Sequence, residues 1–432
     1  MEYKVFGCKT NRYFAEKWLA HPHLDGKEGY FIASCVVTDK AKAKWVKHAK
    51  RKLPTLMSEQ KLYLSGCGNI RDGVVDPKFY EIYSELSAFR DHIEILPEDP
   101  EDFMMTKEQK REMMITKIRK LKTLSKSQIF TRKFLVVQTG CDNFCTFCLT
   151  VQARGRHKWR PIDEILDEIR DFVVNGGKEV VLTGINLGAW WAPSSNDYHL
   201  SKFVELVEVI LEKTTLERLR ISSLGVEFVS DELIELFQNT RINPYIHLSI
   251  QSGSTPILKA MNRHYDGIKL REVLTKLRRL KRNDGHTINI WADLIVGFPA
   301  ESEEDFLDTK EIVEQYQITQ LHAFPFSPHV DHYSVPAGSF SDQVPNHIAQ
   351  RRLKDLLQAW SLSFHNYAKE NLGKELRVLI EKEKNGSFSG WSENYLLCSE
   401  WNFSPYPYEK IIRGTVIQWV YTSISEPTSL EE

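Results

Sequence analysis

The sequence contains no apolar run that approaches the roughly 20 residues needed to cross a membrane. Residues 1–5 lack the basic start and the apolar middle of a secretory signal peptide. Acidic and basic residues nearly cancel, with 58 Asp and Glu against 57 Lys and Arg, so the overall charge predicts no polyanionic partner. These absences predict a soluble, cytoplasmic protein that has no membrane partner.

Cysteine is scarce, and its odd number argues against a framework of disulfides. The 432-residue chain has seven cysteines. Cys141, Cys145 and Cys148 lie in one short stretch with the spacing C-x3-C-x2-C. Cys398 stands apart and is interpreted as structural. The remaining three fall in the first 70 residues, about 30 positions apart: Cys8, Cys35 and Cys67.

Residues 1–95 alternate between strand and helix patterns, which predicts a parallel sheet. The predicted strands are 2–8, 29–35 and 60–67, and the predicted helices are 10–20 and 37–53, the second with Thr38 or Asp39 as N-cap. Each of the three early cysteines ends a strand. Carboxyl ends of parallel strands converge at one edge of a sheet, so we expect the three thiols to meet there. The alternative is three separate thiols packed in the core.

Residues 131–365 continue the alternation with six predicted strands, which favours an open or partial α/β barrel. These strands are 133–140, 178–185, 218–224, 245–252, 289–298 and 318–326. The loop with the later cysteines follows the first strand, so it lies at the barrel mouth, where function resides in such folds. Residues 96–130 are interpreted as a linker, 346–372 as one long helix, and 366–425 as a small antiparallel domain that forms a β-barrel.

Three thiolates fit a cubane iron–sulfur cluster better than a zinc ion. Structural zinc takes four protein ligands, whereas a cluster held by three thiolates leaves one iron open to an exogenous chelator. S-adenosylmethionine (SAM) offers an amino and a carboxylate group for that iron, and SAM radical chemistry is a known cofactor class. Phe144 and Phe147 are predicted to shield the cluster from water.

With these features the chain resembles the radical SAM superfamily and, within it, the methylthiotransferases. The resemblance covers nearly the whole chain. It rests on "CDNFCTFC" (141–148) followed by "ARGRHKWRP" (153–161), on "FGCKTN" (6–11), "SCVVTDKA" (34–41) and "SGC" (65–67), and on "SGWSENYLLC" (389–398), which looks like a TRAM RNA-binding domain. The implied architecture is a flavodoxin-like domain, a partial (β/α)6 barrel and a TRAM domain.

The resemblance implies two 4Fe–4S clusters, one on Cys8, Cys35 and Cys67 and one on Cys141, Cys145 and Cys148. It implies transfer of a methyl group from one SAM to sulfur, then insertion of the methylthio group after a second SAM yields a radical. "MNRHY" (261–265) and "DLIVGFP" (293–299) are most similar to the branch that modifies C2 of threonylcarbamoyladenosine at tRNA position 37. Alternatives are isopentenyladenosine in tRNA, an aspartate of a ribosomal protein, or a non-catalytic iron–sulfur RNA-binding protein.

The resemblance also suggests which residues contact the cofactor. The candidates are Glu179, Asn186, Gln251, Ser252, Gly297 and Arg156. Arg154 and Arg160 are candidates for a SAM carboxylate or an RNA phosphate. The alternative is that these are ordinary loop and strand-end residues. The sequence departs from the family at Gly225, where a Glu is usual, and across 324–338, which lacks an Arg-Pro-Gly.

Local charge predicts contact with RNA, and the resemblance implies that this RNA is the anticodon stem-loop of a tRNA. Residues 40–52 and 107–133 are rich in Lys and Arg. Aromatic residues lie among cations, as in RNA-binding surfaces: Trp45, Trp159, and in the last domain Trp391 and Tyr395 with Lys382 and Lys384. The alternative is that these aromatic residues belong to the core. The other predicted partner is an electron donor such as flavodoxin or ferredoxin, and a monomer is expected.

Overall fold

A four-stranded parallel sheet begins the chain in the computed structural model, which describes residues 1–102, 131–329, 334–384, 387–399, 403–405 and 413–424. Its strands are β1 (Glu2–Val5), β2 (Gly29–Ser34), β3 (Lys61–Gly66) and β6 (Ile93–Ile95). All neighbours are parallel, in the order β1-β2-β3-β6. The predicted parallel α/β class is therefore confirmed. The strand order is sequential, whereas the flavodoxin order places the first strand inside the sheet.

Two helices cover opposite faces of this sheet. On β2, Tyr30 and Ile32 face α2 (Asp39–Lys52), while Phe31 and Ala33 face α1 (Lys9–Leu19), as the alternation of a strand requires. Thr38 is the N-cap of α2, since its hydroxyl accepts from the backbone N–H of Ala41. The smaller elements here are β4 (Ile70–Arg71), β5 (Val74–Val75) and α3 (Phe79–Ile82).

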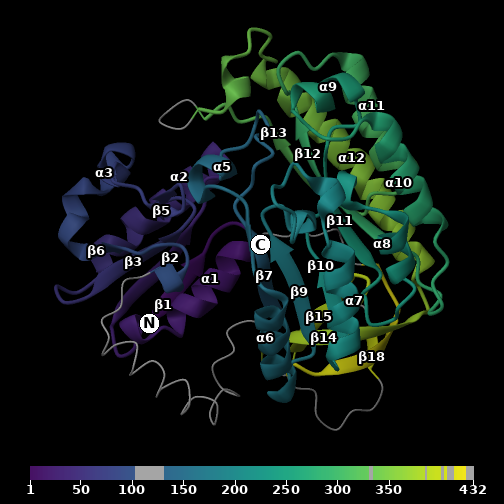
Figure 1. Cartoon of the computed structure of the whole chain (residues 1–432), viewed down its shortest axis with the longest axis horizontal. Coiled ribbons are helices and arrows are strands. Elements are labelled where there is room, and N and C mark those ends of the chain that lie inside the picture. Colours follow the sequence, from purple (N-terminus) through teal and green to yellow (C-terminus); the bar gives the residue numbers. More distant parts are fainter. Residues whose placement is uncertain (103–130, 330–333, 385–386, 400–402, 406–412, 425–432) are drawn as a thin grey trace.

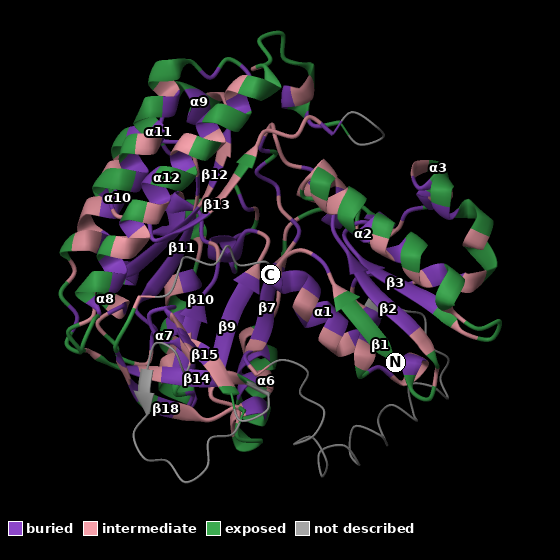
Figure 2. Cartoon of the chain, turned by 180° about the vertical axis from the view of Figure 1, so that it is seen from behind, coloured by how far each residue is buried: buried purple, intermediate pink, exposed green. Residues whose placement is uncertain are grey.

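Helix α1 joins this first part to the barrel. Trp18 and Ala15 pack in the core beneath the first sheet, whereas Tyr13 and Phe14 belong to the core of the barrel. In Figures 1 and 2, α1 lies between the first sheet and strand β7 (Lys133–Thr139). The Tyr13 hydroxyl donates to Glu168 and accepts from Arg160. Because Glu168 lies on α6 (Ile162–Val174), these bonds connect α1 to a helix of the barrel.

The barrel has six parallel strands, as predicted. They are β7, β9 (Glu179–Gly184), β10 (Arg218–Ile221), β11 (Tyr245–Gln251), β12 (Asn289–Val296) and β13 (Gln320–Pro325). Two bridges, Leu219–Ile242 and Leu224–Leu248, join the β7–β10 sheet to the β11–β13 sheet. A short antiparallel strand, β8 (Lys158–Trp159), pairs with the end of β7. One cluster of aliphatic and aromatic side chains forms the apolar core of the barrel.

Helices surround the barrel strands and bury their apolar faces on them (Figure 2). They are α6 (Ile162–Val174), α7 (Phe203–Lys213), α8 (Asp231–Leu236), α9 (Thr255–Ala260), α10 (Gly267–Arg279), α11 (Glu303–Gln315) and α12 (Asn346–Glu370). The short helix α5 (Thr150–Arg154) instead packs Ala153 into the core of the N-terminal sheet. No helix among the described residues is long and apolar enough to cross a membrane.

An antiparallel sheet follows α12. Its strands are β14 (Glu375–Lys384), β15 (Ser387–Ser392), β16 (Leu397–Ser399), β17 (Phe403–Pro405) and β18 (Val416–Tyr421), in the order β16-β15-β14-β18-β17. Cys398 is buried in its core, as expected for a structural thiol. Most of the predicted linker and of the basic run 107–133 lies outside the described residues.

The antiparallel sheet packs against the amino-terminal ends of the barrel strands, opposite the cysteine loop. Arg220, on β10, donates to the backbone carbonyls of Ser392 and Glu393, at 2.7 and 2.8 Å. Tyr395 stacks on the ring of Trp291, on β12, with 4.4 Å between ring centroids. Figure 1 shows β14, β15 and β18 in yellow beneath the barrel.

Candidate functional site: two cysteine triads

The first cysteine triad forms where the sequence predicts it, at the carboxyl ends of β1, β2 and β3. Cys8 is the N-cap of α1, Cys35 follows β2 directly and Cys67 follows β3 directly. Gly7 has φ +86°, and a Cβ there would lie 2.7 Å from the Sγ of Cys35, so only glycine permits this approach. Cys35 and Cys67 are buried and Cys8 is half-buried.

These three thiols interact with one another electrostatically. A hydrogen bond to Cys67, then burial and the charges of Cys67 and Cys8, raises the pKa of Cys35. The same hydrogen bond from Cys35 lowers the pKa of Cys67, and the positive charge of Arg154 lowers it further. Thiols that lie this close to one another can bind the same metal group, and they lose their protons when they do so, because the thiolate is the form that binds a metal.

Arg154 supports the first triad from inside the molecule. Its guanidinium donates to the Asn11 side chain at 3.0 Å and pairs with Glu98 at 2.6 Å, and its side chain is 2% exposed. This placement corrects the expectation that Arg154 contacts a SAM carboxylate or an RNA phosphate. The sequence places it in a polar loop, but α5 carries it into contact with the N-terminal sheet.

The second triad lies in the loop after β7, at the barrel mouth. Each of its thiols accepts one N–H hydrogen bond: Cys141 from the Asn143 backbone at 3.4 Å, Cys148 from the Thr150 backbone at 3.3 Å, and Cys145 from Arg263 at 3.5 Å. Burial raises the pKa of Cys141 to about 12. Cys141 therefore favours the thiol form until a cation binds it, and N–H donors to sulfur tune a cluster's potential.

The two triads are close together because α5 spans the space between them. This helix begins two residues after Cys148 and ends at Arg154, whose charge acts on Cys67. Five helical residues rise about 7.5 Å. The backbone N–H groups of Asp72 and Gly73, just beyond Cys67, donate to the carbonyls of Gln152 and Ala153 at 2.9 Å.

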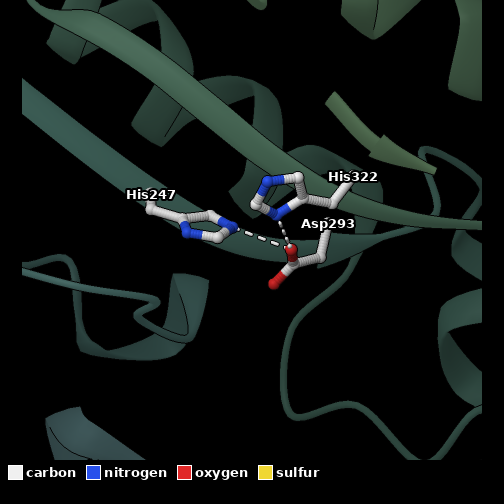
Figure 3. Close-up of side chains that lie close together, drawn as sticks. All are labelled: His247, Asp293 and His322. Atoms are coloured by element: carbon white, nitrogen blue, oxygen red, sulfur yellow. Dashed lines mark hydrogen bonds and ion pairs between the residues drawn. The ribbon is translucent and has the colours of Figure 1, made fainter. Parts of the chain in front are cut away.

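Three thiols at each site suit an iron–sulfur cluster, because each thiolate that holds a cubane binds a different iron atom. A different group of ligand atoms lies elsewhere in the described part of the chain, where His247, Asp293 and His322 come within 4.8 Å of one another (Figure 3).

Arg263 and Glu227 are site residues that the sequence did not reveal. Arg263 bonds Cys145 and lies 3.8 Å from the Glu227 carboxylate, which is 2% exposed. A Cβ at Gly225 would lie 2.5 Å from that carboxylate. Gly225 therefore makes room for the Glu227 carboxylate.

Four of the predicted cofactor contacts lie at the barrel mouth. Asn186 donates its side-chain amide to Asn143, inside the cysteine loop, at 3.2 Å. Gln251 and Gly297, after or at the ends of β11 and β12, both have positive φ, 66° and 69°. Ser252 is fully buried, with its hydroxyl 3.2 Å from that of Thr309. The backbone of each of these residues therefore lies at a strand end, which is where ligands bind in such a barrel.

Arg156 is also at the mouth, in an open position. Its side chain is 75% exposed, it pairs with Asp142 at 3.4 Å, and its guanidinium lies 5.2 Å from the ring centre of Phe144. Phe144 itself is about half exposed, which corrects the expectation that it shields the cysteines from water. Phe147 packs into the small cluster that contains Met261 and Phe298.

Glu179 and Arg160 do not face the mouth, contrary to expectation. Glu179 starts β9, at the opposite end of the barrel, and its two oxygens accept from Arg218 and Arg220 at 2.7 and 2.6 Å. Burial would raise the pKa of Glu179, but the charges of Arg220 and Arg218 outweigh it and lower the pKa to about 2. Arg160 is held by Glu168 and by the carbonyl of Val136.

Several predicted RNA contacts are structural. Trp45 lies on the buried face of α2. Tyr395 packs against the barrel strands, with Trp391 beside it. Trp159 stacks on Trp191 with 4.3 Å between ring centroids, and Trp191 is partly exposed. Lys382 is exposed, and the side chain of Lys384 lies outside the described residues. The predicted cations that lie at the surface are therefore Lys382 and the exposed Lys and Arg residues of α2.

Known proteins are similar to this chain in sequence. The model of the Radical SAM superfamily matches residues 135–313, which includes the second triad. Threonylcarbamoyladenosine tRNA methylthiotransferase MtaB of Thermotoga maritima is 31% identical over 419 residues, covering 91% of this chain and 89% of that protein. The protein of the same name from Rickettsia prowazekii is 29% identical over 381 residues, covering 88% and 87%. tRNA-2-methylthio-N(6)-dimethylallyladenosine synthase of Rickettsia canadensis is 33% identical over 258 residues, covering 60% and 56%.

The superfamily match defines the class, and the relatives define the group within it. This chain belongs to the tRNA methylthiotransferase family of radical SAM proteins.

Proposed function

We propose that this protein inserts a methylthio group at C2 of N6-threonylcarbamoyladenosine at position 37 of tRNA. The observation that carries the proposal is the placement of two cysteine triads at the two ends of the short helix α5. A relative that covers most of the chain carries the name of this activity. This reaction needs both a radical and a sulfur donor, and two adjacent three-thiol sites can supply both.

Each triad would hold one 4Fe–4S cluster, Cys8, Cys35 and Cys67 the first and Cys141, Cys145 and Cys148 the second. With SAM, two clusters with one open iron each supply radical and sulfur-transfer chemistry. Arg154 and Arg263 offset the negative charge of the thiolates at the two sites.

The remaining mouth residues would bind SAM. The proposed contacts are Asn186, Gln251, Ser252, Gly297 and Arg156. The first four lie at the strand ends beside the cysteine loop, and Arg156 offers a solvent-accessible guanidinium for a carboxylate.

The RNA would be a tRNA anticodon stem-loop, bound in part by α2. Its exposed residues Lys40, Lys44, Lys47 and Arg51 follow the i, i+4, i+7, i+11 spacing of one helical face. Asp39, at the start of α2, contacts Ser327 and His329 in the loop after β13, so this face begins near the barrel mouth. The antiparallel sheet after α12 would act as a TRAM domain, and a flavodoxin or ferredoxin would supply electrons to a monomeric enzyme.

Nucleoside analysis of tRNA tests the proposal. Mass spectrometry of digested tRNA from cells with and without the gene should show 2-methylthio-threonylcarbamoyladenosine only when the protein is present. If cells without the gene instead lack the methylthio group on dimethylallyladenosine, that base is the substrate. Unchanged tRNA in both strains would contradict the proposal.

A further inference from the structure

An exposed tryptophan, Trp191, stands on the loop after β9. It is 38% exposed, whereas its neighbour Trp190 is buried in the barrel core. Trp191 has φ +70°, a backbone conformation that bulky side chains rarely adopt because it costs free energy. The fold therefore holds a large apolar ring at the surface at a cost that core packing does not explain. Strain of this kind is typical of binding sites.

Two side chains flank the Trp191 ring. Trp159, on β8, stacks on it with 4.3 Å between ring centroids and an interplanar angle of 27°. Trp159 also packs against the barrel core, so it gives the ring a firm support. The Lys202 ammonium lies 5.3 Å from the centre of the Trp191 ring. A supported aromatic ring beside a cation can stack on a nucleobase and pair with a phosphate at the same time.

The present ion pair of Lys202 does not prevent such a contact. Its partner is Glu205, three residues along the chain, at 3.6 Å, and both side chains are about half exposed. Exposed ion pairs of this kind contribute little free energy. A phosphate can therefore take the place of the Glu205 carboxylate at small cost.

His157 connects the Trp191 loop to the loop of the second triad. Its ring contacts the carbonyl of Ala192, which follows Trp191, at 3.1 Å. Its backbone N–H donates to the side chain of Asp142 at 3.4 Å, and Asp142 follows Cys141 directly. The Trp191 ring is thus held beside the barrel mouth, where the proposed radical forms.

We propose that Trp191 stacks on a nucleobase next to the reactive base of the anticodon loop, while Lys202 pairs with a phosphate of the same strand. A radical at the barrel mouth reaches C2 of a base only when that base leaves its stack. The neighbouring base then loses a stacking partner, which an aromatic side chain can replace. This inference rests on the proposed function, because it needs an RNA substrate with unpaired bases beside the modified one.

A protein surface, such as that of the electron donor, fits this place less well. Protein interfaces centre their aromatic residues in patches that are depleted of charged side chains. Here Lys202 lies by the ring, and the exposed Lys158 directly precedes Trp159. Cations around an aromatic ring favour a polyanion that also presents flat bases.

The test combines variants of the protein and of the RNA. Fluorescence anisotropy measures the binding of anticodon stem-loops to the cluster-loaded enzyme, with intact RNA and with an abasic nucleotide at position 36 or 38. We expect the wild type to bind one of the abasic RNAs about 10-fold more weakly than the intact RNA, the effect of losing one stacked base. Trp191→Gly removes the ring and suits the positive φ, so it should bind these two RNAs equally. Trp191→Phe should keep most of the preference.

Tyr3→Ala is the matched control. Tyr3 is exposed to a similar degree (41%), but it lies on β1 at the end of the sheet away from the first triad. This variant should keep the wild-type preference for intact RNA. The melting temperature and iron content of each variant show that its fold and its clusters are intact.

Three outcomes overturn the inference. The first is a wild type that binds the intact RNA and both abasic RNAs equally. The second is a Trp191→Gly variant that keeps the wild-type preference. The third is a Trp191→Gly variant with unchanged RNA affinity that loses SAM cleavage driven by reduced flavodoxin but not by dithionite, which would assign the ring to the electron donor. If the wild type still methylthiolates tRNA, the proposed function stands and the stacking site alone fails.

Discussion

Arg263 donates to the thiol of Cys145 at 3.5 Å, although 118 residues separate the two in the chain. Arg154 occupies the corresponding place at the first triad, where its charge acts on Cys67. Both guanidinium groups are buried, and both also meet a carboxylate, Glu227 and Glu98 respectively. Each triad therefore has its own buried cation, which favours thiolates over thiols.

Arg263→Met should weaken the second site without unfolding the barrel. The variant removes the donor to Cys145 and leaves the Glu227 carboxylate without its cation. Loss of such a supporting residue costs about 10- to 100-fold in metal affinity or activity. We expect a fall of that size in 5′-deoxyadenosine formed under anaerobic reduction with SAM. Arg351→Met, which removes a surface pair with Glu303, should leave the rate within twofold of wild type.

The two triads should separate by function when one cysteine of each is removed. Cys145→Ala should abolish SAM cleavage, because two thiols and an arginine cannot hold the second cluster. Cys35→Ala should spare SAM cleavage but stop methylthiolation. The measurement is liquid chromatography of 5′-deoxyadenosine and of digested RNA from the same reaction. A Cys35→Ala variant that still forms product would contradict the sulfur-donor role of the first triad.

The basic face of α2 should contribute a salt-dependent part of tRNA affinity. Replacing Lys44 and Lys47 with Gln removes two phosphate contacts, so the slope of log affinity against log salt should become less steep by about 1.5. Filter binding or fluorescence anisotropy across a salt series measures this slope. Lys178→Gln with Lys213→Gln changes the charge equally at the opposite end of the barrel and should leave the slope unchanged. Equal slopes in both double variants would remove α2 from the RNA interface.

Glu179 should stabilise the contact between the barrel and the antiparallel sheet in a pH-dependent way. Its pKa is about 2 in the folded state against an ordinary 4.5, so its contribution is full above pH 4.5 and is lost as the pH falls from 4.5 towards 2. Glu179→Gln should lower the free energy of unfolding by about 3 kcal/mol near neutral pH. Urea unfolding should show this difference shrinking below about pH 4. Glu217→Gln, which removes an exposed partner of Lys178, should have little effect.

The sequence predicts the strands, and the position of a cysteine at the end of each early strand, because both depend on local pattern. Short apolar runs that alternate with helical segments predict all six barrel strands, and the parallel order of the early strands brings the first triad together. Arg263 and Glu227 were not predictable this way, because their roles arise from contacts between distant segments. Glu179 was misplaced although its position at the start of a strand, rather than the end, was visible. Trp45 shares one buried face of α2 with Val46 and Ala49, so its position in the helix, and not its lysine neighbours, determines its burial.

The most direct test of two separate cluster sites is the iron content of anaerobically reconstituted protein. The wild type should bind about eight iron atoms per chain, and a variant with Cys8, Cys35 and Cys67 all changed to Ala should bind about four and still cleave SAM. A wild type with about four iron atoms, or a triple variant with as much iron as the wild type, would contradict the account.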